Sequence, residues 1–561
     1  MIESNTNPAP DEALPDVATH EPGDDAAAVE SGTESAADRN EAPRAARPSH
    51  GAQIVETTEV VLTAPILAFV FRAFFIEPFI IPTGSMAPAL LGAHATQLCT
   101  NCGWEFDYGP QDPPREADPT FVLPRQAVCP NCHERIDLRS ETSAPRAGDR
   151  ILVHKWPFAI GGWFGPRRWD VIVFRDPSDP QRNYIKRLIG LPNETIEIID
   201  GDIYINDRIA RKPAAAQQVL WSVVFDQDHM PLRSSRPRPG AESKGGPAAA
   251  PGAGWSGLAA RVLRYDANDD VRRAIRFDPH ESEYARDFSA FNRASSRTVV
   301  RDLRLTGEIT FSSGTGGCRL TLLRGAHRHV AGGKTPERGV FELGEPGRLR
   351  SGHAFTAEVF ADGKVTFVIE QADESGEARE VFRRETRLRS IRRGRPIAFE
   401  FAHVDYRVWL AIDGRRVLTS SDDAYSPDLA ALRGLRSPAP AAIGISASSV
   451  AFDLRHLHID RDVYYTNRNA CGTARRAHTN HPFKLYDGEY FTLGDNSPRS
   501  LDGRFWDRRG PHLQSKPYRI GTVRADQIVG RAFFVYLPGL VPLDAAGRWR
   551  IPDLGRVRFI R

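Results

Sequence analysis

The sequence predicts a mainly β protein that is held at a membrane by one N-terminal helix and contains two inserted modules. An apolar segment near the N-terminus favours the helix. Two regions of similar β character, 147–210 and 484–540, stand about 270 residues apart, and one domain can hold another as an insertion because domain termini often lie close together. The intervening chain contains many short alternating strands, as in an antiparallel sandwich or jelly roll. A four-cysteine segment forms the second predicted insertion.

Residues 1–54 are predicted to be a disordered cytoplasmic tail. Residues 1–50 hold 11 Asp and Glu against 3 Arg, a net charge of 3 − 11 = −8, and include no aromatic side chain. Such a segment cannot bury enough apolar surface to offset its ordering entropy. The arginines Arg39, Arg44 and Arg47 precede the apolar segment and favour a cytoplasmic N-terminus.

Residues 55–77 are predicted to be a transmembrane helix. The uninterrupted apolar run from Val60 to Phe71 is shorter than the roughly 20 residues that span a bilayer. Extension to Val55 and Ile76 reaches that length and lets Arg72 snorkel toward an interface. A buried core helix is the alternative. A cleaved leader would lie nearer the N-terminus.

Residues 78–98 and 147–212 contain a serine and a lysine that could act together. Ser85 follows Gly84, which permits a close backbone approach, and Pro82 and Pro88 stiffen the chain on either side. Lys186 lies in the segment Tyr184-Ile185-Lys186-Arg187-Leu188-Ile189-Gly190. A desolvated lysine can lose its proton and serve as a base for a serine nucleophile. Taken singly, an exposed loop hydroxyl and a solvated Lys-Arg pair are the simpler interpretations.

Residues 484–540 supply a third polar segment, Gly494 to Trp506. Its charged residues Asp495, Asp502 and Arg504 could form a network, and Ser500 could orient a lysine amine. A polar turn with a surface ion pair, which contributes little stability, is the alternative.

Residues 99–138 are predicted to be a zinc ribbon. Cys99 and Cys102 form one Cys-x-x-Cys pair and Cys129 and Cys132 form another, which is the ligand pattern of a Cys₄ structural zinc site. Four thiolates would close the coordination sphere, so we expect no catalytic metal. Disulfide pairing is the alternative in an oxidising compartment. Cys318 and Cys471 have no assignable partner.

The remaining segments differ in pattern. Residues 213–295 show little regular pattern, and within them 231–257 are rich in Pro, Gly, Ala and Ser, so 213–295 are predicted to be a linker of uncertain structure. Residues 296–462 show period-2 apolar sets separated by turns such as Asp413-Gly414, which predict a jelly-roll sandwich. That region weakly resembles laminin-G or concanavalin-like domains, which often bind glycans or proteins, although a spacer role fits equally well. Residues 541–561 are predicted to be a C-terminal tail.

Five segments in order resemble type I signal peptidases, the membrane-anchored serine/lysine proteases that remove signal peptides. They are the apolar span, the Ser85-Met86 motif, Gly148-Asp149-Arg150, Tyr184-Ile185-Lys186-Arg187, and Gly494-Asp495-Asn496-Ser497 followed by Asp502-Gly503-Arg504. The resemblance covers the anchor, 78–98, 147–210 and 484–540. The sequence departs from the family pattern at Asn193, where Gly is common, and at Ala89, where Thr is frequent.

The resemblance implies a role for each matching residue. Ser85 would be the nucleophile and Lys186 the general base, and the Ser85 N–H and the Thr83 hydroxyl would form the oxyanion hole. Ser500 would orient Lys186. Asp495, Asp502 and Arg504 would support the site from an outer layer. Met86 would pack beside the nucleophile and Tyr184 beside the base.

The resemblance also implies partners and location. The substrates would be exported preproteins cut after a small residue, and no cofactor would be needed for catalysis. The chain would cross the cytoplasmic membrane once, with its catalytic domain on the outer face. A net charge of +3 gives no reason to expect nucleic acid as a partner. Two other interpretations are a membrane-tethered scaffold with a vestigial protease core and a self-cleaving regulatory protease.

Overall fold

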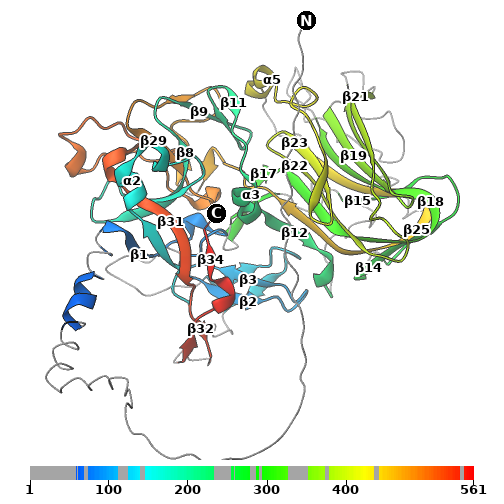
Figure 1. Cartoon of the computed structure of the whole chain (residues 1–561), viewed down its shortest axis with the longest axis horizontal. Helices are drawn as coiled ribbons and strands as arrows, with labels where there is room; N and C mark the ends of the chain where they lie inside the picture. The colour runs from blue at the N-terminus through cyan, green and yellow to red at the C-terminus, as the bar shows by residue number, and fades with distance from the viewer. Residues whose placement is uncertain are drawn as a thin grey trace, which may run out of the picture. The chain divides into compact units, whose positions relative to one another are not determined.

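The protein is mainly β in a computed structural model, as predicted from the sequence (Figure 1). The structure describes residues 59, 61–67, 72, 74–110, 124–138, 146–232, 254–257, 260–277, 286–289, 293–325, 352–372, 378–434, 441–469, 471–543 and 549–560. The tail expected over 1–54 lies outside these residues. The named α-helices within the described ranges are short: α2 (Trp156–Ile160), α3 (Ala214–Leu220) and α5 (Leu429–Arg433).

An antiparallel sheet combines the two β regions that stand far apart in the sequence. Its strand order is β1-β6-β31-β7-β8-β29-β30, and β34 pairs with β31. The central strand β31 (Ile528–Leu537) pairs with β6 (Arg150–His154) and with β7 (Val171–Arg175). The other members are β1 (Ile76–Ile80), β8 (Asn183–Gly190), β29 (Glu489–Leu493), β30 (Val523–Arg524) and β34 (Arg558–Phe559).

Two predicted boundaries change because of this sheet. Ile76 and Glu77, assigned to the transmembrane helix, lie in strand β1 and pair with His154 and Val153 of β6. The segment 541–561 is not merely a tail, because β34 completes one end of β31 and Arg558 donates to the Ala89 carbonyl. Within the described residues, no helix is long and apolar enough to cross a bilayer. Ten of the 21 residues of 55–75 lie outside them.

A second sheet of four strands contains β9, the strand that follows β8 in the chain. It has the order β11-β10-β9-β28, with β9 (Thr195–Ile199), β10 (Asp202–Ile205), β11 (Arg208–Ile209) and β28 (Phe483–Lys484). Asp200 and Gly201 both have positive φ, of 55° and 88°. Two such residues form the tight turn that matches the twist of a hairpin, and Asp-Gly between two apolar runs is the sequence typical of such a turn.

The cysteine segment consists of two small hairpins. One joins β2 (Ala95–Leu98) to β3 (Glu105–Tyr108), and the other joins β4 (Gln126–Val128) to β5 (Arg135–Asp137). The first hairpin begins at residue 95, four residues before the predicted boundary. We call 95–138 the cysteine module.

The β-sandwich has a large sheet built around two long strands, β18 (Leu303–Gly325) and β25 (Ala441–Arg461). These strands pair with each other along most of their length, and β18 also pairs with β19 (Gly352–Phe360) and β22 (Ile397–Val404). Apolar residues at alternate positions, such as Leu305, Ile309 and Phe311, enter one continuous core. Burial of that face explains why the alternation predicted a sandwich.

The predicted linker over 213–295 is in part a component of the sandwich. Strands β12 (Ser222–Asp226), β14 (Val262–Ala267) and β15 (Arg273–Phe277) all pair with β25. The sequence signal was weak there because the strands are short and separated by Pro- and Gly-rich chain. The sandwich is therefore formed by strands that begin at Ser222 rather than at 296.

Candidate active site

Ser85 lies in a one-turn 3₁₀ helix, η1 (Gly84–Met86), that follows β1. Gly92 and Gly148 pack closely against the backbone that leads to this turn. A Cβ at Gly92 would lie 2.8 Å from the Gly84 nitrogen, and one at Gly148 would lie 2.9 Å from the Ile81 carbonyl carbon. Asp149 Oδ2 accepts from the Leu91 N–H at 2.9 Å. These contacts fix the path of the nucleophile turn.

Lys186 projects from β8 toward this turn. Its Nζ donates to Ser85 Oγ at 2.7 Å and to the Ile185 carbonyl oxygen at 3.0 Å. Lys186 is 3% exposed, whereas Ser85 is half-buried. Burial lowers the pKa of Lys186 to about 8, against opposing effects of Asp502 and Asp495. A lysine with that pKa is partly neutral near physiological pH and can accept a proton from a serine hydroxyl.

The loop after β29 holds the Ser85 turn through hydrogen bonds to the carbonyl oxygens of that turn. Asn496 donates from its backbone N–H to the Ser85 carbonyl oxygen at 3.0 Å and from Nδ2 to the Gly84 carbonyl oxygen at 2.9 Å. Gly494 permits this approach, because a Cβ there would lie 2.6 Å from the Ser85 oxygen and would overlap the Ser500 side chain. The loop therefore requires glycine at 494.

Two fully buried ion pairs support the loop. Arg187 donates to both carboxylate oxygens of Asp495, each at 2.7 Å, and to the Trp169 carbonyl at 2.9 Å. Arg504 donates to both carboxylate oxygens of Asp502, at 2.9 and 2.8 Å. Asp502 in turn accepts from the Gly494 N–H at 3.1 Å. Each acid next to Lys186 already has a bidentate arginine partner. The attraction of these acids for the Lys186 ammonium is therefore smaller than the effect of desolvation, and the pKa of Lys186 is lowered.

Two expectations about this network need correction. Asp495 does not join the Asp502–Arg504 pair; Arg187 is its partner. Ser500 does not hydrogen-bond to Lys186, and its buried Oγ has no hydrogen-bond partner among the described residues. The second contact of the Lys186 amine is instead the Ile185 carbonyl.

The remaining predicted residues surround the dyad. Thr83 is extended and half-buried immediately before the turn. Met86 is fully buried in an apolar cluster with Ile151 and Val171. The Tyr184 ring lies 5.2 Å from Lys186 Nζ and stacks on Trp506 at 6.3 Å.

Sequence reasoning missed several supporting residues. Arg187 was interpreted only as one half of a Lys-Arg pair, and Asn496 had no assigned role. Asn469 was also missed, although its Nδ2 donates to the carbonyls of Ser497 and Ser500 at 3.1 and 2.9 Å. The available signal was the position of Arg187 directly before the apolar residues Leu188 and Ile189, which indicates a buried strand in which an arginine requires a partner.

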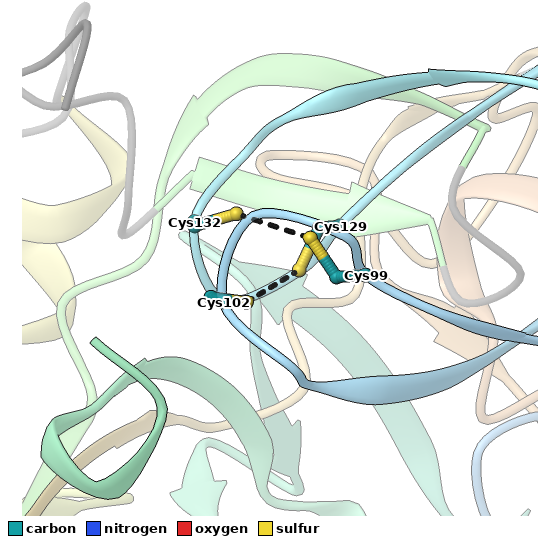
Figure 2. A group of neighbouring side chains, drawn as sticks. All are labelled: Cys99, Cys102, Cys129 and Cys132. Carbon is teal, nitrogen blue, oxygen red and sulfur yellow. Dashed lines mark hydrogen bonds between the residues drawn. The ribbon is translucent and has the colours of Figure 1, made fainter. Parts of the chain in front are cut away.

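The four module cysteines converge from two loops (Figure 2). The Sγ atoms of Cys99 and Cys132 lie 3.5 Å apart, as do those of Cys102 and Cys129. These separations exceed a disulfide bond of about 2.05 Å, and all four thiols are free. Thiolates around one zinc ion at about 2.3 Å lie about 3.8 Å apart. The donor set and its spacing fit a tetrahedral zinc ion.

Comparison with known proteins identifies a peptidase domain. Residues 123–234 and 442–537 match the family model "Signal peptidase, peptidase S26". The match includes Lys186 and the loop 494–504, and it begins after Ser85. These segments are therefore similar to the S26 peptidases, and the similarity indicates a serine peptidase.

Curated relatives carry the name Signal peptidase I. The protein from Rickettsia typhi is 30% identical over 142 residues, which cover 25% of this chain and 39% of that relative. The protein from Rickettsia prowazekii is 58% identical over 43 residues, 8% of this chain and 16% of the relative. The chain thus matches about two fifths of the length of the first of these relatives.

Solved structures with low similarity align with about a third of the chain. A carbohydrate binding module from Bacillus subtilis is 12% identical, with a TM-score of 0.19, over 35% of this chain and 86% of that one. A Bacillus subtilis protein of unknown function with a galectin-like fold is also 12% identical, with a TM-score of 0.23, over 36% of this chain and 83% of that one.

Proposed function

We propose that this protein is a membrane-bound serine endopeptidase that removes N-terminal signal peptides from exported preproteins, cutting after a small residue. The contact between Lys186 Nζ and Ser85 Oγ at 2.7 Å is the observation that carries the proposal. The S26 match and the Signal peptidase I relatives support the same reaction class.

The mechanism follows from the pKa of Lys186. The neutral amine accepts the Ser85 proton while Oγ attacks the scissile carbonyl, and the resulting ammonium then protonates the leaving amine. A water molecule, activated by the same lysine, hydrolyses the acyl-enzyme. The Ser85 N–H and the Thr83 hydroxyl would stabilise the oxyanion, and such donors commonly contribute 10²–10³-fold in kcat.

The outer residues position the dyad in this proposal. Asp495 with Arg187, and Asp502 with Arg504, fix the loop that holds the Ser85 turn, while Met86 and Tyr184 exclude water beside the two reacting groups. Ser500 packs on Gly494, and its carbonyl accepts from Asn469.

Attachment to the cytoplasmic membrane is part of the proposal. Within the described chain, large apolar side chains are exposed on the segment from α2 to η2 (Gly162–Phe164), where Trp163 is 84% exposed. Lys155, just before α2, donates its N–H to the Phe75 carbonyl. The exposed aromatic segment therefore starts beside Phe75, the end of the proposed span 55–75, and aromatic groups of this kind favour the interface of a bilayer. A single span over 55–75 would place the catalytic sheet on the outer face.

We also propose a structural zinc ion on Cys99, Cys102, Cys129 and Cys132. Such an ion would tie the two hairpins of the cysteine module together, which apolar packing alone does poorly in a segment this small. It has no role in the chemical step.

Cleavage of a model preprotein tests the function. Detergent-solubilised wild type should release a mature product whose new N-terminus follows a small residue, and Ser85→Ala should release none while keeping its fold by circular dichroism. A well-folded Ser85→Ala protein that still cuts at the same bond would refute the proposal. A folded wild type that cuts no preprotein would favour the scaffold interpretation.

A further inference from the structure

A cluster of three histidines and two aspartates lies outside the catalytic region and outside the four-cysteine site. Asp226 ends strand β12, and Asp228 and His229 lie in the turn η3 (Gln227–His229) that follows. His456 and His458 come from β25, about 230 residues later in the chain. Donor atoms of Asp226, Asp228 and His458 all lie within 4.8 Å of one another.

The contacts of His458 distinguish this cluster from ordinary ion pairs. Its Nδ1 lies 3.4 Å from Asp226 Oδ2, and its Nε2 lies 3.8 Å from Asp228 Oδ2. Both distances exceed the usual hydrogen-bond length of about 2.7–3.2 Å. The shorter one matches the separation of about 3.4 Å between two ligands that share one tetrahedral ion at about 2.1 Å. An imidazole binds an ion through one nitrogen, so His458 would supply one donor atom, and one donor atom each from Asp226, Asp228 and His458 lie within 4.8 Å of one another.

The other two histidines each contact one of the same two carboxylates. His229 Nδ1 lies 3.0 Å from Asp226 Oδ2, and His456 Nδ1 lies 2.8 Å from Asp228 Oδ2. Hydrogen-bonding groups that orient carboxylate ligands in this way are a regular component of metal sites. Asp226 is 2% exposed and is held in place because its Oδ1 accepts from the Asp228 N–H at 2.8 Å.

We infer that Asp226, Asp228 and His458 bind a divalent transition-metal ion of the zinc type. Mixed imidazole and carboxylate donors select such ions over Mg²⁺ or Ca²⁺, which prefer all-oxygen sites. Three protein ligands leave a coordination position for water. The His458 side chain is about a third exposed, so the ion has access from solvent.

The site would link three parts of the chain. Asn131 of the cysteine module accepts from the Asp226 N–H and donates to the His229 carbonyl, both at 2.8 Å. Trp104 of the same module packs edge-on to the His229 ring at 5.0 Å. An ion on Asp226 and His458 would therefore fix the turn that contacts the cysteine module to strand β25 of the sandwich.

The test is the metal content of the full-length protein, purified without a histidine tag or chelator and freed from excess Zn²⁺ by gel filtration. We expect His458→Asn and Asp228→Asn each to carry one equivalent less zinc than wild type. The exposed His481→Asn should match wild type, and Cys102→Ser/Cys132→Ser should retain the equivalent that His458→Asn loses. Circular dichroism excludes unfolding, and the two single variants check each other.

Cobalt substitution separates the two sites by their ligands. Cobalt on thiolates shows an intense sulfur-to-metal charge-transfer band, whereas cobalt on nitrogen and oxygen does not. The equivalent absent from His458→Asn should lack that band. Equal metal content in wild type and both variants, or loss only of the sulfur-ligated ion, would overturn the inference and leave only hydrogen-bonded Asp–His pairs.

Discussion

The surroundings of Lys186 and the main apolar cluster of the sandwich bury different kinds of residue, and charged groups such as Arg324 and Glu358 are buried elsewhere in the sandwich. The sandwich core is an apolar cluster that includes Leu305, Phe355 and Phe401, each fully buried. The catalytic region buries Lys186 at 3% exposure together with the pairs Arg187–Asp495 and Asp502–Arg504. Buried charges add little net stability relative to apolar packing, and removing one partner is costly. The comparison shows that the charged groups buried around Lys186 set the pKa and position of one amine.

Replacement of the lysine should have the largest effect on activity. Lys186→Met removes the base, and we expect preprotein cleavage to fall by about 10⁴-fold or more. The exposed sandwich residue Lys364, whose Nζ lies 3.2 Å from Glu385, provides the control, and Lys364→Met should retain wild-type activity. Initial rates of preprotein cleavage measure both. A Lys186→Met enzyme with near-normal turnover would show that another base acts.

The same variant should be more stable than wild type. Burial lowers the pKa of Lys186 from 10.5 to about 8, so below pH 8 the folded state must hold a disfavoured charge. The cost is at most about 3 kcal/mol, at about 1.36 kcal/mol per pKa unit. Urea denaturation should show Lys186→Met stabilised at pH 7, with the difference shrinking between pH 8 and 10.5. Equal stabilities at pH 7 would indicate that the amine is not desolvated.

Breaking an ion pair should have unequal effects in the two regions. Asp495→Asn leaves Arg187 buried without its charge partner and should destabilise the fold by about 3–5 kcal/mol. Glu380 of the sandwich pairs with Arg383 at 2.6 Å, but both side chains are more than 40% exposed. Glu380→Gln should therefore cost less than about 1 kcal/mol. Similar losses in urea denaturation for both would remove the distinction between the regions.

The glycine at 494 should matter for the turnover number. Gly494→Ala would push the loop away from the Ser85 carbonyl, and a displacement of about 1 Å can cost about 10²-fold in rate. A Cβ at Gly555 would meet only an Asp553 oxygen at 3.7 Å, so Gly555→Ala should leave kcat unchanged. Steady-state kinetics of both variants would contradict this account if they gave equal kcat values.

The pH profile should show the most graded effect. Since neutral Lys186 is the active form and its pKa is about 8, kcat/KM should rise about tenfold per pH unit below pH 8 and level off above it. Lys364→Met should not change the profile. A profile that is flat from pH 6 to 9 would contradict the role of the amine.

The sequence predicted the sandwich and the catalytic strands for different reasons. Alternation in runs such as Val408, Leu410 and Ile412 directly reports one buried face, so the sandwich could be predicted locally. The short strand β34 and strands β12, β14 and β15 carry little alternation, and they form because long partner strands, β31 and β25, pair with them. That information is not local in the sequence.

The residues of the candidate site could be predicted from the sequence, but most of the contacts between them could not. The motifs around Ser85 and Lys186 pointed to the dyad, which the fold brings to 2.7 Å. The partner of Asp495 and the hydrogen bonds of Asn496 depend on contacts between residues about 310 and 410 positions apart. The Asp226–His458 cluster was missed for the same reason, since each half alone resembles a solvated turn or strand.

Trapping of the acyl-enzyme tests the central claim most directly. Wild-type protein and a model preprotein would be mixed, quenched with acid, digested and analysed by mass spectrometry. The account predicts a covalent signal-peptide adduct on the peptide that contains Ser85, and no adduct in Ser85→Ala. An adduct on Ser500, or cleavage by wild type with no adduct on any serine, would contradict a Ser85–Lys186 mechanism.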